Sequence, residues 1–288
     1  MFTVASDGSV DIRKTVLTES GKTYKVTGGE ADLTISYRDY ASKTVRVTLF
    51  AKKLTTAEEF RHISDEPSAY YIMMNDIDFH GASTPSLGEL SGLLEGNGYS
   101  VKNVCLSDSQ YTAGLFRKVS GTIRNLSLEN IVENSVLGVM AGQVGLLAVE
   151  LSGKVENVYL SGSMPSNIAA NTQWADFRNW GWKAGFICQT ATNAVINNVV
   201  LDVTTGVGTD ISLICGNGNY SLGNVFAVRH EDGDPSSYGG SYKTIPDTTV
   251  EISLMTRLIS ASASVFDPSI WTVENGRLAL IKGCFRAV

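Results

Sequence analysis

The residues best suited to bind a ligand lie between 174 and 182, where three of the chain's four tryptophans occur. Aromatic faces stack on the apolar C–H surfaces of sugar rings, while nearby carboxylate, guanidinium and amide groups bind the hydroxyls. This segment therefore predicts a glycan site, to which a tyrosine of a later segment is added. Packing of the tryptophans against the protein's own flank, or contact with a partner protein, are the alternatives. The predicted ligand-binding residues are Trp174, Asp176, Phe177, Arg178, Trp180, Trp182 and Tyr238.

A second segment gathers acidic groups, with Glu231, Asp232 and Asp234 following His230. Carboxylates can hold calcium or supply the acid and base of glycoside hydrolysis. The spacing lacks the full calcium-binding loop, and a solvated turn explains the same residues. We therefore expect no metal, cofactor or catalytic residue. The alternative is an enzyme in which Asp176 or one of these three carboxylates acts as acid or base.

A repeating scaffold must position these segments, because the phrase aliphatic-x-Asn-aliphatic-x-aliphatic recurs five times. Its irregular spacing suits a solenoid of strands, from which loops of variable length can leave. A second strand phrase (GLF at 114–116, GLL at 145–147, GFI at 185–187, SLI at 212–214) precedes four of the five at near-constant distance. Asparagine tolerates left-handed backbone, so we expect equivalent corners whose side chains pair as one ladder. The five asparagines are Asn103, Asn125, Asn157, Asn198 and Asn224.

The stretch 70–282 resembles the β-helical proteins that carry the GLUG motif, which occur in bacterial surface proteins and adhesins and in some phages of gut bacteria. The matching phrases are YIMMNDIDF at 71–79, LEGNGYSVKN at 94–103 and AGLF at 113–116. The endings FDPSIW at 266–271 and NGRL at 275–278 are similar to that family's last strand and cap. The resemblance implies a parallel β-helix and no shared catalytic site.

The first 52 residues differ from the rest. Segments 23–27, 32–37 and 43–49 alternate as antiparallel strands do. The last two are similar to the final hairpin of bacterial immunoglobulin-like domains, so we expect 1–52 to be a reduced or truncated Ig-like domain and 53–288 to be the β-helix. Segment 55–63 predicts a capping helix over the solenoid end, with Thr55 or Thr56 as N-cap and Leu54, Phe60 and Ile63 on one face. The predicted fold class is all-β.

Charge and composition exclude several classes of function. A net charge of −6 argues against nucleic acid or an anionic membrane as partner. No apolar run is long enough to cross a bilayer, and the first residues lack a signal peptide. The four cysteines lack metal or redox spacing, so we expect buried free thiols, with disulfides between coils as the alternative: Cys105, Cys188, Cys215 and Cys284.

Together these observations favour a non-catalytic adhesin or receptor-binding module. We expect it on a bacterial surface or a virion, with a polysaccharide or surface glycan as partner. A polysaccharide depolymerase and a structural spacer or virion decoration protein are the alternatives. Self-association, or contact with other surface or virion proteins, stays open.

Overall fold

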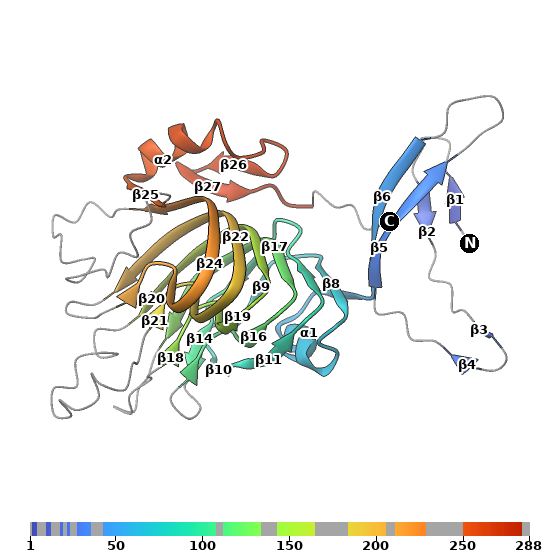
Figure 1. Ribbon diagram of the computed structural model, residues 1–288, viewed down its shortest axis with the longest axis horizontal. Coiled ribbons are helices and arrows are strands. Elements are labelled where there is room, and N and C mark those ends of the chain that lie inside the picture. Colours follow the sequence, from blue (N-terminus) through green and yellow to red (C-terminus); the bar gives the residue numbers. More distant parts are fainter. Residues whose placement is uncertain are drawn as a thin grey trace.

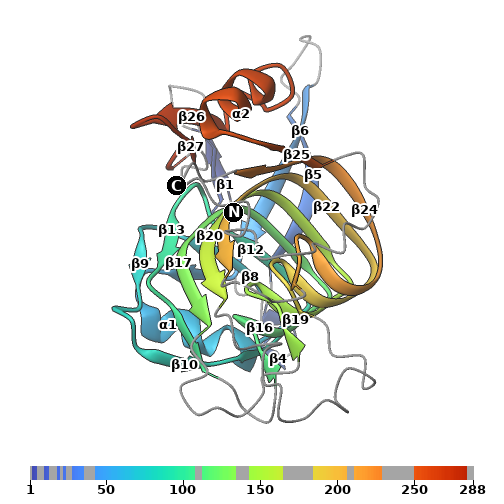
Figure 2. The ribbon, with the colours of Figure 1, turned by 90° about the vertical axis from the view of Figure 1, so that its left-hand side faces the viewer.

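The computed structural model describes residues 51–107, 112–133, 143–164, 184–205, 211–228 and 250–283, together with short strands within 2–50. The protein is all-β, and its main element is a large, strongly curled parallel sheet (Figure 1). Seen along the direction in which the strands succeed one another, the long strands form nested arcs (Figure 2). The predicted all-β class is confirmed at this level.

Fifteen described strands belong to the curled sheet, and all their mutual pairings are parallel. Two more parallel pairs lie beside it, β15 (Thr112–Ala113) with β18 (Gln143–Val144) and β21 (Ala184–Gly185) with β23 (Ile211–Ser212). The fifteen are β7 (Lys52–Leu54), β8 (Tyr70–Met73), β9 (Ile77–Asp78), β10 (Ser83–Pro85), β11 (Leu87–Leu90), β12 (Leu93–Glu95), β13 (Ser100–Lys102), β14 (Cys105–Ser107), β16 (Phe116–Val119), β17 (Thr122–Glu133), β19 (Ala148–Leu151), β20 (Lys154–Met164), β22 (Cys188–Thr205), β24 (Cys215–Val228) and β25 (Val250–Ser253).

The core consists of columns of like side chains, because successive repeats pair in register. Leu94, Ile123, Val155 and Ile196 are direct cross-strand partners in β12, β17, β20 and β22, and each is fully buried. Parallel strands lie about 4.8 Å apart, so side chains in such a column touch their neighbours above and below. The repeating aliphatic positions of the sequence are thus the inner face of the sheet.

The predicted asparagine ladder exists at one corner. Asn125, Asn157, Asn198 and Asn224 all have left-handed backbone, with φ between 52° and 54°. Each side-chain amide nitrogen donates to the amide oxygen of the preceding repeat, at 2.9 Å, 3.0 Å and 2.9 Å for the three successive pairs. The first member, Asn125, donates instead to both carboxylate oxygens of Glu95, at 3.0 and 3.2 Å. The ladder therefore begins on an acidic side chain.

The placement of Asn103 in the same ladder is wrong. Lys102 pairs with Glu129, so Asn103 is equivalent to Asn130, which donates to it at 2.8 Å. Asn103 in turn donates to Asp78 at 3.0 and 3.1 Å. The same phrase therefore occurs at two successive corners, around Asn125 at one and around Asn103 at the next, and the spacing of one copy does not say which corner it occupies.

A third corner is built from glycine. In the Ser-Gly pairs at 91–92, 120–121 and 152–153, the glycine lies directly on the carbonyl of the preceding repeat. A Cβ at Gly92, Gly121 or Gly153 would lie 2.2, 2.0 or 1.9 Å from a backbone oxygen. Only glycine therefore permits this approach. The second strand phrase of the sequence also lies at a corner. Its first copy is GLF at 114–116, and β15 ends at Ala113 while β16 begins at Phe116.

The predicted capping helix is confirmed as α1 (Ala57–Arg61), followed by a 3₁₀ turn, η1 (His62–Asp65). Thr56 is the N-cap and forms a capping box with Glu59. Phe60 is fully buried and packs edge-on against Phe79, with ring centroids 5.9 Å apart. The helix follows β7, the strand that ends one path of the sheet, and brings its apolar face into the main core.

The C-terminal phrases form neither the last strand nor an end cap, contrary to the expectation from the resemblance. The last sheet strand is β25; the phrases fall after α2 (Met255–Ser262) and in the antiparallel hairpin β26 (Trp271–Glu274) with β27 (Arg277–Leu280). These elements form a second cluster with Tyr159, Val200 and Phe226, which alternate with inward residues and so lie on the outer face. Trp271 stacks on Phe266, with centroids 4.5 Å apart. The segment covers the flank of the sheet (Figure 1).

The N-terminal region contains three separate antiparallel pairs. They are β1 (Phe2–Val4) with β2 (Val10–Ile12), β3 (Thr18–Glu19) with β4 (Lys22–Thr23), and β5 (Gly28–Ile35) with β6 (Lys43–Phe50). The predicted hairpin corresponds to β5 and β6. Since these are small two-stranded sheets, the described strands form no sandwich. The boundary at 52/53 and the Ig-like assignment stay predictions.

We predict that Asn198→Ala lowers the free energy of unfolding by about 3 kcal/mol. Two ladder bonds are lost, at about 1 kcal/mol each, and alanine must take left-handed backbone at a cost of about 1 kcal/mol. Asn275→Ala is the control, because Asn275 is also left-handed (φ 51°) but lies in the β26–β27 turn, outside the ladders described here. It should lose only about 1 kcal/mol. Urea denaturation compares the two, and equal losses would show that the ladder adds nothing.

Candidate functional site

One edge of the curled sheet carries the connections between repeats. β14, β17, β20 and β22 end at this edge, and β15, β18, β21 and β23 begin there. The ends are aligned, with Leu106 opposite Glu133 and Met164 opposite Thr205. Segments 108–111, 134–142, 165–183 and 206–210 therefore leave from, and return to, matching positions of successive repeats. We call this the loop-bearing edge.

The predicted glycan-binding residues lie outside the described residues. Trp174, Asp176, Phe177, Arg178, Trp180 and Trp182 fall in 165–183, which is anchored at the loop-bearing edge by the buried ends Met164 and Ala184. Tyr238 and the acidic residues Glu231, Asp232 and Asp234 fall in 229–249, also outside them. That segment leaves β24 at Val228 and returns at Val250, which pairs with Val225 in the neighbouring strand. The structure thus describes where the two segments leave and rejoin the sheet, and the glycan-site assignment stays a prediction.

A shallow polar groove of about 390 Å³ lies on the outer face of β16, β19 and β22, on the strands that follow the loop-bearing edge. Lys118, Glu150 and Thr190 are in register across these strands. Lys118 is paired with Glu89 of β11 at 3.4 Å. The polar side chains of its lining are Lys118, Glu150, Ser152, Gln189, Thr190 and Thr192.

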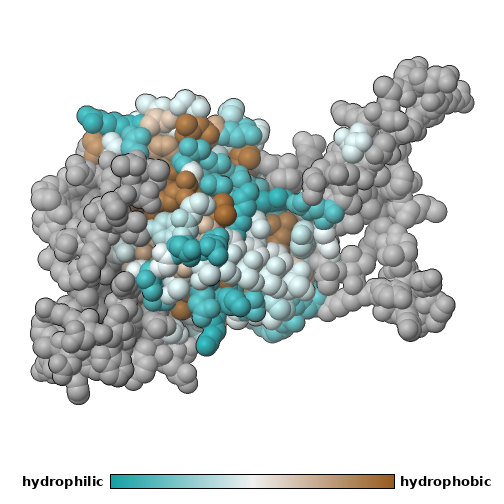
Figure 3. All heavy atoms as spheres, viewed as in Figure 1, coloured by the Kyte–Doolittle hydropathy of each residue, from teal (hydrophilic) through white to brown (hydrophobic). Residues whose placement is uncertain are grey.

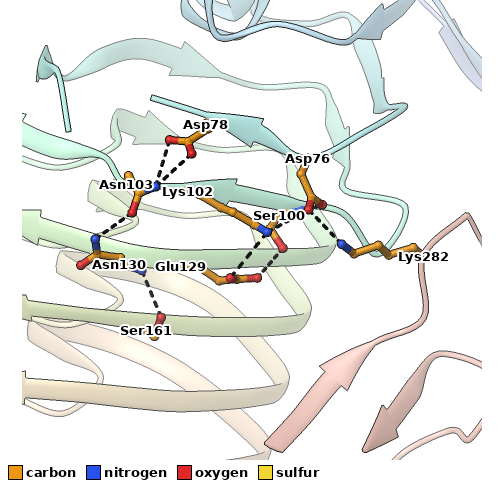
Figure 4. Close-up of polar contacts among 9 residues, drawn as sticks. All are labelled: Asp76, Asp78, Ser100, Lys102, Asn103, Glu129, Asn130, Ser161 and Lys282. Carbon is orange, nitrogen blue, oxygen red and sulfur yellow. Dashed lines mark hydrogen bonds and ion pairs between the residues drawn. The ribbon is translucent and has the colours of Figure 1, made fainter. Parts of the chain in front are cut away.

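A cluster of charged side chains lies over the first repeats and involves residues from distant parts of the chain (Figure 4). Asp76 accepts from the ammonium groups of Lys102 at 2.8 Å and Lys282 at 2.9 Å, and from the backbone N–H of Ser100 at 3.1 Å. The Ser100 hydroxyl donates to Glu129, which also lies 3.9 Å from Lys102. We call these five residues the clasp.

The charges of the clasp are arranged to hold the C-terminal segment on the first repeats rather than to transfer protons. Partial burial by itself raises the pKa of Asp76, but the lysine ammonium groups and the Ser100 amide together lower it below its ordinary value. The hydrogen bond to Asp76 raises the pKa of Lys102. Acid–base catalysis needs pKa values near the working pH. Both groups are instead shifted away from neutrality, as in a structural ion pair.

Backbone contacts add to the clasp. The N–H of Gly283 donates to the carbonyl of Asn97 at 2.8 Å. A Cβ on Gly98 would lie 2.0 Å from the Ile281 carbonyl, and Gly98 has φ +77°. The C-terminal segment therefore runs directly over the turn at 96–98. Since it also packs on the outer face of β20, β22 and β24, it joins the last repeats to the first.

Glu95 is a fully buried carboxylate with several hydrogen-bond donors around it. It accepts from Arg124 Nε at 2.7 Å, from the Asn97 N–H at 2.9 Å and from Asn125. Burial raises its pKa, and these donors counter part of that effect. All its oxygens serve the ladder and the neighbouring turn, so its role is structural.

Other candidate groups add little within the described part of the chain. Cys188 and Cys215 are free, buried and opposite each other in β22 and β24, and Cys105 is free and partly buried; Cys284 lies outside the described residues. His62 and His80 are exposed. Over these residues no three His, Cys, Asp or Glu side chains are grouped to hold a metal, and no helix is long and apolar enough to span a membrane.

Sequence reasoning did not find the clasp or the groove. Both depend on register across repeats, and the clasp joins Asp76 to Lys282, 206 positions apart. A signal for the groove exists in the sequence, because Glu89, Lys118 and Glu150 each stand two residues before a Ser-Gly pair. Aligning the repeats on Ser-Gly would have placed these charges in one row. No comparable signal exists for Lys282.

We predict that Asp76→Asn loosens the C-terminal segment and lowers the free energy of unfolding by about 1 kcal/mol, since these ion pairs are partly exposed. Amide hydrogen exchange at Gly283 should become faster, and Glu274→Gln in β26 is the control. The folded pKa of Asp76 lies below its unfolded value of about 3.9. Its contribution is therefore present above that value and lost as pH falls through the folded pKa. The difference between parent and variant should vanish in acid; a difference that persists there would contradict the ion-pair role.

Comparison of the chain with models of known protein families, with curated proteins and with solved structures found no match. The resemblance to GLUG-motif proteins therefore remains a prediction from a few phrases. What the geometry provides is a stack of paired repeats, an edge from which connections leave at matching positions, and a polar groove on the strands that follow that edge. Function must be inferred from these features.

Proposed function

We propose that this chain is a non-catalytic glycan-binding module of a surface or virion adhesin, built on a parallel β-helix of the GLUG type. The observation that carries the proposal is the loop-bearing edge. Four connections begin and end at matching positions of successive repeats, and the one with the clustered tryptophans is among them.

The scaffold supports a display role. A repeat whose inner columns and corners are fixed tolerates connections of any length at its edge, because the strand register does not depend on them. The connection 165–183 is anchored by Met164 and Ala184, both buried. A long connection held at both ends is a suitable base for an aromatic binding surface, since less ordering is needed on binding.

The tryptophans support a carbohydrate ligand. The fourth tryptophan, Trp271, is buried and stacked on Phe266, so it serves packing. Trp174, Trp180 and Trp182 belong instead to a polar segment with Asp176 and Arg178, the composition that sugar sites use. Polar, stacked repeats with clasped ends suit an exposed extracellular setting on a bacterial cell or virion. The Ig-like assignment of 1–52 belongs to the same proposal.

No observation within the described residues favours the depolymerase. The charged groups of the clasp are mutually neutralised, and the acidic residues of 229–249 lie outside the described part. We propose accordingly that the protein leaves a bound polysaccharide uncut. A structural spacer remains the outcome if no glycan binds.

The proposal is tested with a panel of bacterial and host glycans, immobilised and probed with the whole chain. The parent should bind a subset, and the variant Trp174→Ala/Trp180→Ala/Trp182→Ala should lose at least tenfold in affinity, because stacking on each ring contributes roughly 1 kcal/mol. Trp271→Phe, altered in the buried cluster, is the matched control and should keep binding. Circular dichroism must show that each variant is folded. Binding that survives the triple change would overturn the aromatic site.

The absence of cleavage is a separate prediction. Any polysaccharide that the parent binds should keep its length on size-exclusion chromatography after prolonged incubation. Shortening that disappears in Asp232→Asn or Asp176→Asn would establish the depolymerase in place of the adhesin.

A further inference from the structure

We infer that the polar groove on β16, β19 and β22 is a second saccharide subsite, and that it selects chains with amino sugars over acidic ones. The inference rests on the proposed function for its ligand class. Its evidence is independent, because every residue of the groove is described and none belongs to the aromatic segment.

The groove has the size and the partners for a saccharide. At about 390 Å³ it falls in the range of small-ligand sites, yet its lining is polar, with two threonines, a serine and a glutamine. Gln189 is only 7% exposed although it carries an amide on the outer face. One end of that amide accepts from the Thr190 hydroxyl. Within the described part of the chain, the other end has no protein partner, and it is available to a ligand hydroxyl.

Because the strands pair in register, the polar side chains of the groove form a row across the strands. Lys118, Glu150 and Thr190 follow one another across three strands at a spacing of about 4.8 Å. A linear chain laid across the strands therefore meets one polar side chain per strand. Such a direction also leads from one repeat to the next.

Charge decides the class of sugar. Lys118 is engaged by Glu89 at 3.4 Å, and Ser120 also donates to Glu89 at 2.9 Å. Glu150 is exposed and is the cross-strand neighbour of Lys118, but the ion pair that Lys118 forms within the described residues is the one with Glu89. The row thus carries one lysine between two glutamates, a net charge of −1 that a protonated amino group of a ligand would neutralise. A uronic or sialic acid would instead add another anion to the row.

The test measures binding of three oligosaccharides of equal length to the whole chain: oligo-glucosamine at a pH where its amines are protonated, its N-acetylated form, and oligogalacturonate. The parent should bind oligo-glucosamine best. Glu150→Gln should weaken that binding about tenfold, the loss expected for one charge-assisted hydrogen bond, and should leave the N-acetylated form unchanged. Glu251→Gln, also exposed but in β25, is the matched control.

A charge reversal makes the inference sharper. Glu150→Lys should abolish oligo-glucosamine binding and create binding of oligogalacturonate, because the row would then carry two lysines. Unchanged preferences in both Glu150 variants would overturn the groove while leaving the aromatic site intact. If binding is lost only in the triple tryptophan variant, the groove is likewise overturned and the aromatic site stands. If the parent binds no glycan, the groove and the aromatic site are both overturned.

Discussion

The architecture depends on one constraint, the in-register pairing of each repeat with the next. Parallel strands satisfy their backbone groups only when the neighbouring strand lies at a fixed spacing along their whole length. Every position of one repeat therefore meets the same position of the next, and each side chain is selected for contact with its own kind. Three kinds of side-chain position meet this requirement: aliphatic residues that pack in columns, asparagines whose amides hydrogen-bond in a ladder, and glycines that let the backbones of successive repeats touch. At the outer face and the loop-bearing edge, side chains do not have to pack on the equivalent residue of the next repeat, so residue types vary there.

The outer face shows what this freedom is used for. Over the later repeats it is apolar and is covered by α2 and the β26–β27 hairpin, whereas over the first repeats it is charged and is held by the clasp. On the face shown in Figure 3, hydrophobic residues concentrate where the C-terminal elements lie, and the surface below is mainly hydrophilic or neutral. The C-terminal segment therefore links distant repeats through side chains, independently of the strand ladder. In a stack whose repeats contact only their neighbours, stability is the sum of repeat and interface terms; a segment that joins the first and last repeats adds a contact that the strand ladder does not provide.

The features that could be predicted from the sequence are local ones. The left-handed asparagines, the capping box of Thr56 and Glu59 and the strand phrases each depend on a few adjacent residues. The corner of Asn103 was wrongly assigned because two corners share one phrase, and only the pairing of Lys102 with Glu129 separates them. The C-terminal phrases were wrongly assigned because an aromatic pattern gives burial but not the face that is covered. The groove and the clasp arise from register between repeats, which no single window contains.

The ladder from Glu95 to Asn224 also has a direction. Every side-chain amide donates toward the N-terminal repeats, all but the last also accept from the C-terminal side, and the first donor meets a carboxylate. An additional repeat inserted between Asn125 and Asn224 would need only one more left-handed asparagine to continue the chain of bonds. One inserted before Glu95 would place that carboxylate inside the ladder, and since an ionised carboxylate accepts but does not donate hydrogen bonds, it could not continue the chain of bonds toward the inserted repeat. Repeats can therefore be added by duplication on the C-terminal side of Glu95 but not before it. The number of repeats can change within the array while the first repeat stays the same.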